Sequence, residues 1–245
     1  MIVTSIPCRA CPLRRQPAFK TGTPEQIDFI QTMKMGEAVF ESGEPVIAEG
    51  AVEAPLYTLL SGWAFRYLTL QDGRRQILNF LLPGDLIGVQ ANFLGAATHG
   101  VESMGSTVFC RLNRGRMWDL YREHPELGFD VTWLTAHEEG LVDETLLSVG
   151  RRTAMERIAT LLLYLYKRAA VIGMAADGVL ETPVRQTHLA DALGLSRPHV
   201  NETLGRLEKK GLFRFRRGRL EILNPRALEQ LADYYDQPLA PRPLL

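Results

Sequence analysis

The chain has 245 residues, 46% of them hydrophobic and 23% charged, which is enough for one or two domains with a substantial core. Its longest apolar stretch, residues 158–166, is too short to cross a bilayer, and the sequence does not open on an apolar signal segment. Three cysteines cannot form a disulfide framework. We therefore expect a cytoplasmic protein that is neither secreted nor membrane-bound.

Charge is distributed unevenly, although the 28 Lys and Arg residues balance the 28 Asp and Glu residues. Between Arg185 and Arg219 there are nine basic and three acidic residues, a local net charge of +6. One basic lobe on a neutral protein is typical of a modular DNA-binding protein, because only the contacting face has to neutralise phosphates. A solvated charged face is the alternative interpretation of the same charges.

Two patterns precede the basic lobe in the first half of the chain. Residues 1–18, with two cysteines and three prolines, indicate an irregular N-terminal arm, and Thr23 to Gln26 form a capping box that opens a short helix. From Met33 to Leu112 glycines recur at roughly ten-residue spacing, which is typical of antiparallel strands folded into a sandwich or roll. Asp72-Gly73 is typical of a hairpin turn.

Helical periodicity takes over at Pro125. Residues 125–149 predict a helix about 37 Å long, too long to be buried fully against a small roll. We expect it to form a coiled-coil-like dimer, with packing within its own chain as the alternative. A second helix over 151–170 and a β segment near 179–184 follow, and the proline-rich residues 238–245 predict a disordered tail. Two faces of the long helix are candidate dimer seams, one with Leu127, Val131, Leu134 and Leu141, the other with Thr132, Thr135, Glu139, Val142 and Leu146.

Residues 186–205 carry a helix-turn-helix pattern. Ala190 is the small residue that two crossing helices need, and Gly194 tolerates the positive φ of the turn. Val200 anchors the second helix, which Ser196 caps, and Pro198 falls in its first turn, where a missing N–H is tolerated.

The same segment predicts the DNA contacts, because Arg can read guanine, Asn can read adenine and Glu can accept from cytosine. Residues 212–223 alternate apolar side chains with Arg around Gly218, which predicts a basic β-hairpin wing beside the phosphates. Any small helical pair could show the Ala, Gly and Val positions, and the basic wing beside them favours the DNA-binding interpretation. The candidate DNA-binding residues are Gln186, Thr187, His188, Ser196, Arg197, His199, Asn201, Glu202, Arg206, Arg216 and Arg217.

This order of parts resembles the Crp/Fnr superfamily of bacterial transcription regulators, and the resemblance runs from about Cys8 to Tyr235. Its markers are Leu60-Ser61-Gly62, Asp72-Gly73-Arg74, the run from Leu82 to Gly88, and Arg157. The resemblance implies an α+β fold with an N-terminal double-stranded β-roll (a cyclic-nucleotide-binding-like jelly roll), a long dimerisation helix and a C-terminal winged helix-turn-helix. The expected ranges are 1–18 for the arm, 19–124 for the sensor roll, 125–150 for the dimerisation helix, 151–237 for the DNA-binding domain and 238–245 for the tail.

The implied function is that of a homodimer on a palindromic promoter site in double-stranded DNA, with RNA polymerase as a further partner of an activator. A signal at the roll or the arm would reach the recognition helix, residues 196–210, through the dimer helix. Well-known members carry a Glu two residues after the capping residue and an Arg further along. Pro198 and Glu202 stand there in this chain, so base reading shifts to Arg197, His199 and Asn201.

The resemblance also places an effector pocket in the roll. Members that bind cyclic AMP have a Glu just after the Gly-Asp-x-x-Gly turn and an Arg-Ser pair about ten residues beyond it, where this chain has Val89, His99 and Gly100. Since a neutral imidazole is a poor replacement for a bidentate guanidinium at a phosphate, we do not expect cyclic AMP to bind in the usual way. The candidate pocket residues are Gly84, Asp85, Gly88, Val89, His99 and Gly100.

The oxygen-sensing branch of the superfamily holds an iron–sulfur cluster with cysteines spaced C-x2-C-x5-C and a distant fourth. Cys8, Cys11 and Cys110 match three of these positions, but the remaining one falls on Pro17, which cannot ligate. A cluster completed by Asp28, a histidine or an outside ligand is one interpretation. We favour the other, in which the arm cysteines have no ligand role and Cys110 is an ordinary buried thiol, so no cofactor is assigned.

Two other classes of function stay open. One is a ligand-binding roll whose helix-turn-helix mediates protein contacts. The other is a cupin-like metalloenzyme, which is disfavoured because His99 is the only histidine within the roll. No nucleophile elbow, phosphate loop or HExxH motif occurs in the sequence, so we do not expect an enzyme.

Overall fold

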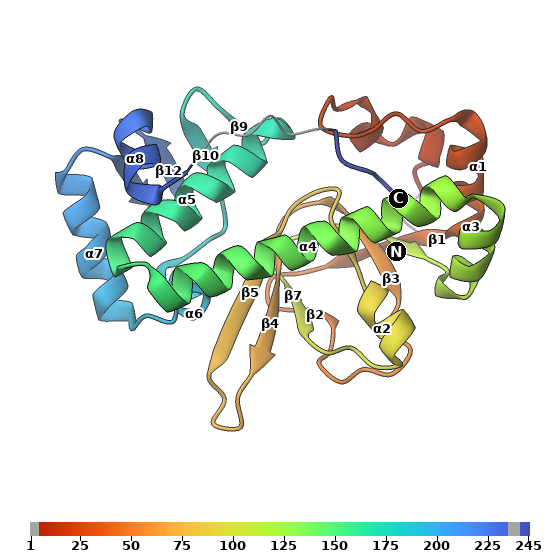
Figure 1. Ribbon diagram of the computed structural model, residues 1–245, viewed down its shortest axis with the longest axis horizontal. Helices are drawn as coiled ribbons and strands as arrows, with labels where there is room; N and C mark the ends of the chain where they lie inside the picture. Colours follow the sequence, from red (N-terminus) through yellow and green to blue (C-terminus); the bar gives the residue numbers. More distant parts are fainter. Residues whose placement is uncertain (1–4, 235–240) are drawn as a thin grey trace. The chain divides into compact units, whose positions relative to one another are not determined.

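A computed structural model describes residues 5–234 and 241–245 of the chain (Figure 1). These residues form two compact units. The first unit contains residues 5–66, 81–140 and 241–245, and the second contains residues 67–80 and 141–234. Among the helices of these ranges, none combines the length and the apolar character that a bilayer span requires.

The β-roll expected from the glycine spacing is confirmed, as two four-stranded sheets. Their facing residues form an apolar core in which Leu59, Leu81, Val101 and Phe109 are fully buried. Gly73 has a φ of +84° and turns the chain between two strands, as Asp-Gly pairs do in hairpins. In sheet order, one sheet is β1 (Lys34–Phe40), β8 (Thr107–Leu112), β3 (Leu56–Ser61) and β6 (Leu86–Ile87), and the other is β2 (Pro45–Ile47), β7 (Gly100–Ser103), β4 (Ala64–Thr69) and β5 (Arg75–Leu81).

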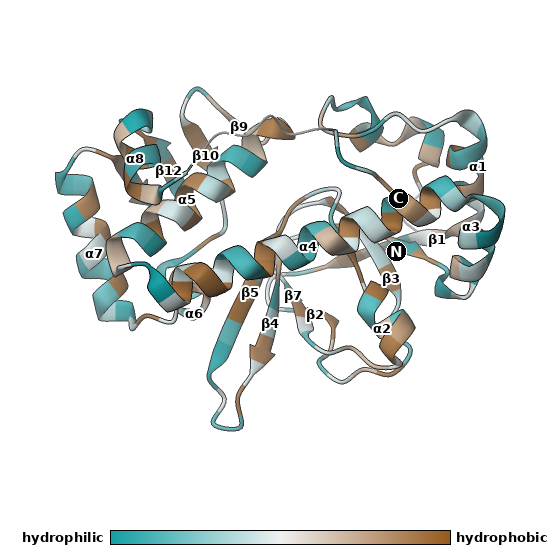
Figure 2. Ribbon diagram, viewed as in Figure 1, coloured by the Kyte–Doolittle hydropathy of each residue, from teal (hydrophilic) through white to brown (hydrophobic). Residues whose placement is uncertain are grey.

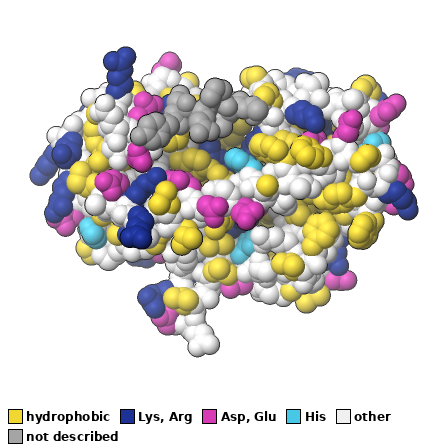
Figure 3. Space-filling view, in the orientation of Figure 1, with side chains coloured by type: hydrophobic (Ala, Val, Ile, Leu, Met, Phe, Trp, Pro, Cys, Tyr) yellow, Lys and Arg dark blue, Asp and Glu magenta, His cyan; other side chains and the backbone are white. Residues whose placement is uncertain are grey.

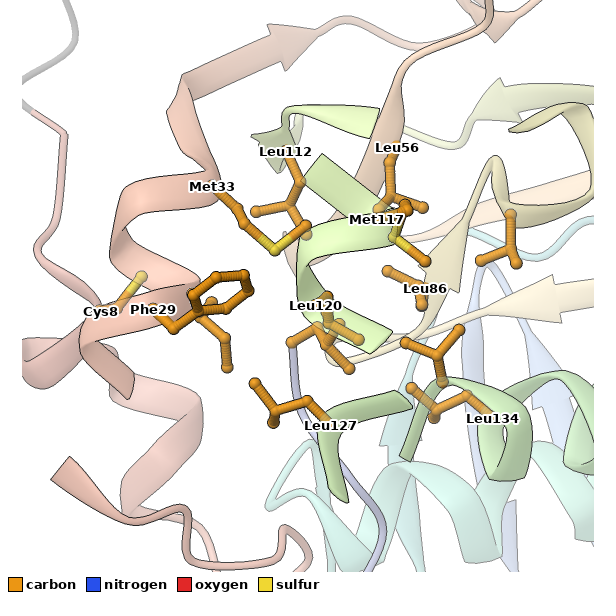
Figure 4. Close-up of a cluster of buried hydrophobic side chains, with 14 residues drawn as sticks. Cys8, Phe29, Met33, Leu56, Leu86, Leu112, Met117, Leu120, Leu127 and Leu134 are labelled. Atoms are coloured by element: carbon orange, nitrogen blue, oxygen red, sulfur yellow. The ribbon is translucent and has the colours of Figure 1, made fainter. Parts of the chain in front are cut away.

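Short helices close the first unit. The expected capping box is present at α1, where Thr23 accepts from the backbone of Gln26 and the Gln26 side chain accepts from Thr23. Apolar side chains from the arm, α1, α3, α4 and the roll meet in one cluster, which includes Cys8, Met33 and Leu120 (Figure 4). The short helices are η1 (Cys8–Ala10), η2 (Pro12–Arg15), α1 (Pro24–Met33), α2 (Val89–Leu94), η3 (Arg114–Arg116) and α3 (Met117–Glu123). The long helix α4 (Pro125–Arg151) has its first sixteen residues in this unit and the rest in the second.

One of the two candidate dimer seams on α4 is wrong. Leu127, Val131 and Leu134 are at most 6% exposed because they pack into the core of the first unit, so this face is not available to a partner. The other face is open: Glu139 is exposed, and Leu146 is 70% exposed. Apolar and polar residues accordingly alternate along the helix (Figure 2).

In the second unit, helices α5 to α8 pack beside a small sheet. α5 (Ala154–Val171) begins with a capping box of Thr153 and Glu156 and packs against α8 (Pro225–Ala232), α7 (Arg197–Lys209) and α6 (Gln186–Leu193). The sheet has the order β11 (Phe213–Arg216), β12 (Arg219–Ile222), β10 (Val179–Glu181) and β9 (Ala175–Ala176). Helix-turn-helix and wing are thus both present, as expected.

The tail differs from expectation. Residues 238–240 lie outside the described residues, but residues 241–245 are not disordered: they pack into the first unit, where Leu244 and Leu245 are each 6% exposed. The prediction failed because proline-rich composition disfavours helices and sheets without preventing an extended segment from binding in a groove.

Candidate nucleic-acid interface and cysteine cavity

The turn between α6 and α7 has the geometry that its sequence predicts. Gly194 is left-handed, with φ 62° and ψ 35°, and the backbone N–H of Leu195 donates to Ala190 over 3.1 Å. The Ser196 hydroxyl accepts from the N–H of His199 and caps α7. Val200 is fully buried on the inner face, which fixes the outer face of α7 toward solvent.

The outer face of α7 carries the candidate base-reading residues, and all of them are exposed. Within the described chain, the guanidinium of Arg197 makes no hydrogen bond or ion pair, so its donors face water at the first turn of the helix. Asn201 accepts from the Gln186 side chain over 3.2 Å, which joins α6 to α7. Glu202 and Arg206 form an ion pair one turn apart. Lys and Arg side chains are visible at the α7 end of the second unit (Figure 3).

His188, one of the candidate DNA-binding residues, caps its own helix and is neutral. Its imidazole accepts from the backbone N–H of Arg185 over 3.2 Å and so caps α6. Burial and the nearby charges of Arg185 and Arg75 lower the pKa of His188 to about 4, which leaves the ring neutral at pH 7. Thr187, beside it, is half-buried.

The wing is a tight hairpin. Arg217 and Gly218 both have positive φ, 52° and 81°, as a two-residue turn of this kind requires. A Cβ at position 218 would lie 2.4 Å from the carbonyl oxygen of Thr182, so the turn needs glycine. Glu208 of α7 accepts from the N–H of Phe215 and pairs with Arg216, which holds the wing against the recognition helix. Sequence reasoning missed this role of Glu208.

The candidate effector residues are not brought together as one polar pocket. Gly84 and Asp85 contact the tail, and Gly88 starts α2 with φ 90° against the carbonyl oxygen of Pro55. Val89 is buried among apolar residues and Gly100 begins β7. Burial, and secondarily the charge of Arg66, lowers the pKa of His99 to about 4.

A buried ion pair lies near His99 that the sequence did not indicate. The Arg66 guanidinium of β4, with its side chain 3% exposed, donates to Glu138 of α4 over 2.6 Å. The charge of Arg66 is therefore paired within the protein, where it links the roll to α4. The composition offered no signal for this pairing, because the two residues are far apart in sequence.

The three cysteines line one cavity of about 20 Å³, together with Lys34, Leu244 and Leu245. Lys34 and Glu37 form a buried ion pair over 2.8 Å beside it. Burial raises the pKa of Cys8 and raises that of Cys110 to about 11, so these thiols are protonated at neutral pH.

An iron–sulfur cluster does not fit this arrangement. The cavity that the three cysteines line is about 20 Å³, which holds about one water molecule and leaves no room for a four-iron cluster beside Leu244 and Leu245. In residues 5–234 and 241–245, no group of three or more His, Cys, Asp or Glu side chains is placed to hold a metal ion. The three cysteines therefore line one cavity, but they are not arranged as the ligands of a metal cluster.

Comparison with known protein families finds a match in each half of the chain. Residues 37–124 match the cyclic nucleotide-binding domain family and residues 156–231 match the Crp-like helix-turn-helix domain family. The chain is 32% identical over 193 residues to the nitrogen fixation regulation protein FixK of Bradyrhizobium diazoefficiens, a match that covers 79% of this chain and 80% of FixK. It is 26% identical over 240 residues to the transcriptional activator protein FnrL of Cereibacter sphaeroides, covering 94% of this chain and 93% of FnrL.

Solved structures agree with these relatives. The structure of FixK2 from Bradyrhizobium japonicum superimposes with a TM-score of 0.73 at 27% identity, covering 82% of this chain and 98% of FixK2. The regulators of this family bind DNA and are dimers, and they are not enzymes, which sets the cupin-like alternative aside. The chain belongs to the Crp/Fnr family of DNA-binding transcription regulators.

Proposed function

We propose that the protein is a cytoplasmic homodimer that binds a dyad-symmetric promoter site through α7 and contacts RNA polymerase when it activates. The observation that carries the proposal is the outer face of α7, where Arg197, His199 and Asn201 are exposed beside the wing. A two-fold dimer presents two such helices about one helical turn of DNA apart, which matches a palindromic site.

The contacts divide into base reading and phosphate binding. Arg197 has its donors free of partners in the described chain and is the strongest candidate for a guanine contact. Asn201 accepts from Gln186 and is the candidate for an adenine contact, while Glu202 and Arg206 neutralise each other and contribute less. Arg217 at the tip of the wing makes no ion pair with the described residues, which suits a phosphate contact.

The open face of α4 is the proposed dimer seam. Its residues follow the alternating three- and four-residue spacing of a coiled coil. Glu139 sits in the middle of that face, and an acidic residue there makes the dimer weaker and therefore adjustable. The face consists of Thr132, Thr135, Glu139, Val142 and Leu146.

We propose that the input is neither cyclic AMP nor an iron–sulfur cluster. Val89, His99 and Gly100 offer no charged group to a cyclic phosphate, since His99 is neutral at pH 7. The cysteine cavity is too small for a cluster while the tail is in place. The signal instead acts on the roll or the arm and changes the arrangement of the α4 helices in the dimer.

The test is DNA binding by fluorescence anisotropy on a site selected from a random library. Arg197→Ala should weaken specific binding by about 1–3 kcal/mol and relax the preference at one base pair per half-site. Arg226→Ala is the matched control, because it removes the same charge from an exposed position of α8. Arg217→Ala should weaken binding to all sequences and lower the salt slope.

Two outcomes would refute the proposal. If Arg197→Ala and Asn201→Ala both bind selected and random DNA as the unaltered protein does, α7 is not the reading helix. If the protein shows no salt-dependent affinity for any duplex, the alternative of a protein-contacting helix-turn-helix replaces DNA binding.

A further inference from the structure

The segment 241–245, here called the tail segment, lies in a groove of the first unit and is held there by its backbone. Arg242 pairs with Phe19 as a parallel β-bridge. The N–H of Arg242 donates to the carbonyl of Ala18 over 2.9 Å, and the carbonyl of Arg242 accepts from the N–H of Lys20 over 2.8 Å. The tail segment thus pairs with residues 18–20 as a neighbouring strand would, which is a recurrent mode of peptide recognition.

The side chain of Arg242 fills a specific site. Its guanidinium forms an ion pair with Asp85, donates to the carbonyl of Pro83 over 2.6 Å and stacks 4.9 Å above the Phe19 ring. The Arg242 side chain is 14% exposed and the Asp85 side chain 8%. A Cβ at Gly84 would lie 2.8 Å from the guanidinium and 2.3 Å from the Phe19 ring, so glycine is what lets the site close.

The end of the tail segment closes the cysteine cavity. Leu244 and Leu245 are part of the cavity wall, together with Cys8, Cys11 and Cys110. The carbonyl oxygen of Leu245 accepts from the Thr58 hydroxyl over 2.8 Å, and that of Leu244 accepts from Arg14 over 3.4 Å. Each of the last two residues therefore has both an apolar and a polar anchor.

We propose that the first unit carries a peptide-binding groove for an Arg-Pro-Leu-Leu segment, that residues 242–245 are its resident ligand, and that their docking seals the cysteine cavity. The groove is formed by residues 18–20, Pro83 to Asp85 and Thr58. The groove recognises the segment by two features. A basic side chain binds at the carboxylate of Asp85 and the ring of Phe19, and two leucines bind in the apolar cavity. This function is separate from DNA binding by α7.

The first experiment measures thiol reactivity in the full chain. Alkylation of each cysteine by a maleimide at pH 7.5 is followed by mass spectrometry under native conditions. In Arg242→Glu, the three cysteines should react at least about tenfold faster than in the unaltered protein, because a hydrogen-bonded charge pair of this kind shifts the docked population by that order. The matched control, Arg226→Glu at an exposed position of α8, should react at the unaltered rate.

The second experiment restores the ligand. A chain ending at residue 240 should bind a fluorescent peptide with the sequence of residues 236–245 and regain protection of its cysteines. The full chain, whose groove is filled, should not bind the peptide, and the same peptide with Arg242→Glu should bind neither. Circular dichroism melting checks that each variant is folded.

The proposal is overturned if folded Arg242→Glu keeps its cysteines as protected as in the unaltered protein. It is equally overturned if the folded shortened chain fails to bind the peptide. Should the shortened chain not fold, Arg242→Glu alone decides, because this substitution leaves the roll and the arm intact. Loss of DNA binding in the Arg197 variants would leave all these results unaffected.

Discussion

Glu37→Ala should strongly destabilise the first unit, because it would leave an ammonium group buried without its carboxylate. The Lys34 and Glu37 side chains are 3% and 2% exposed and 2.8 Å apart. Lys34 also donates to the carbonyl of Ile6 over 2.6 Å, and Glu37 accepts from the N–H of Ile6 over 2.8 Å. The pair therefore holds the arm to β1, and removing one partner of such a buried pair costs about 3–5 kcal/mol.

The pKa of Lys34 determines how the loss of stability in Glu37→Ala depends on pH. Burial alone lowers that pKa, but the hydrogen bond to Glu37 and nearby charges raise it above its ordinary value. A raised lysine pKa stabilises the fold at all pH values below the unfolded pKa, and this contribution is lost as pH rises through the folded pKa. Without Glu37, burial dominates and the lysine can lose its proton, so the difference between the two proteins should shrink toward alkaline pH.

The assay is urea unfolding at fixed protein concentration, followed by tryptophan fluorescence at pH 7 and pH 10. Lys34→Met/Glu37→Leu should recover most of the loss, since apolar replacement of both partners is often neutral. Arg122→Ala, which breaks exposed pairs with Asp119 and Glu123 on α3, is the control and should leave stability unchanged. Unaltered stability in Glu37→Ala, or a double variant as unstable as the single one, would refute the reasoning.

Three further predictions address the seam, the roll and pH. Leu146→Asp should weaken the dimer at least about tenfold in sedimentation velocity, whereas Leu147→Asp, about 100° further round the helix, should not; equal effects would contradict the seam. Gly88→Ala should lower the melting temperature by several degrees, because its Cβ would lie 2.2 Å from the Pro55 oxygen and its φ is +90°; an unchanged melting curve would argue against this turn. The pKa of His99 is lowered to about 4, so the unfolded chain binds a proton that the fold does not, and stability should fall as pH drops from about 6.5 to 4. His99→Phe should flatten that part of the stability–pH curve, and an unflattened curve would assign the loss to other groups.

The helix-turn-helix could be predicted because its determinants are local. Ala190, Gly194 and Ser196 each meet a requirement set by residues within a few positions: a close helix crossing, a left-handed turn and a capped helix end. The roll was predictable for the same reason, through turns such as the one at Gly73. Rules of this kind depend on backbone geometry, which short segments determine by themselves.

Long-range pairings were not predictable. Thr58 meets Leu245 and Arg66 meets Glu138 only because the fold brings distant segments together. The helical periodicity of α4 likewise predicted two candidate dimer seams and did not distinguish between them. Only the packing of Leu127 into the core shows which of the two faces lies against its own chain. A sequence pattern predicts that a face is apolar, whereas the choice of its partner depends on the whole fold.

Three buried charges of the first unit share one arrangement: each ties a segment outside the sheets to the roll. Glu37 holds the arm through Ile6, Arg66 holds α4 through Glu138, and Asp85 holds the tail segment through Arg242. A buried pair of this kind is either formed or broken, since a half-separated pair loses its attraction without regaining water. The roll therefore holds its three attached segments through discrete contacts, and a signal that opens one of them shifts a population between two states rather than deforming the roll gradually.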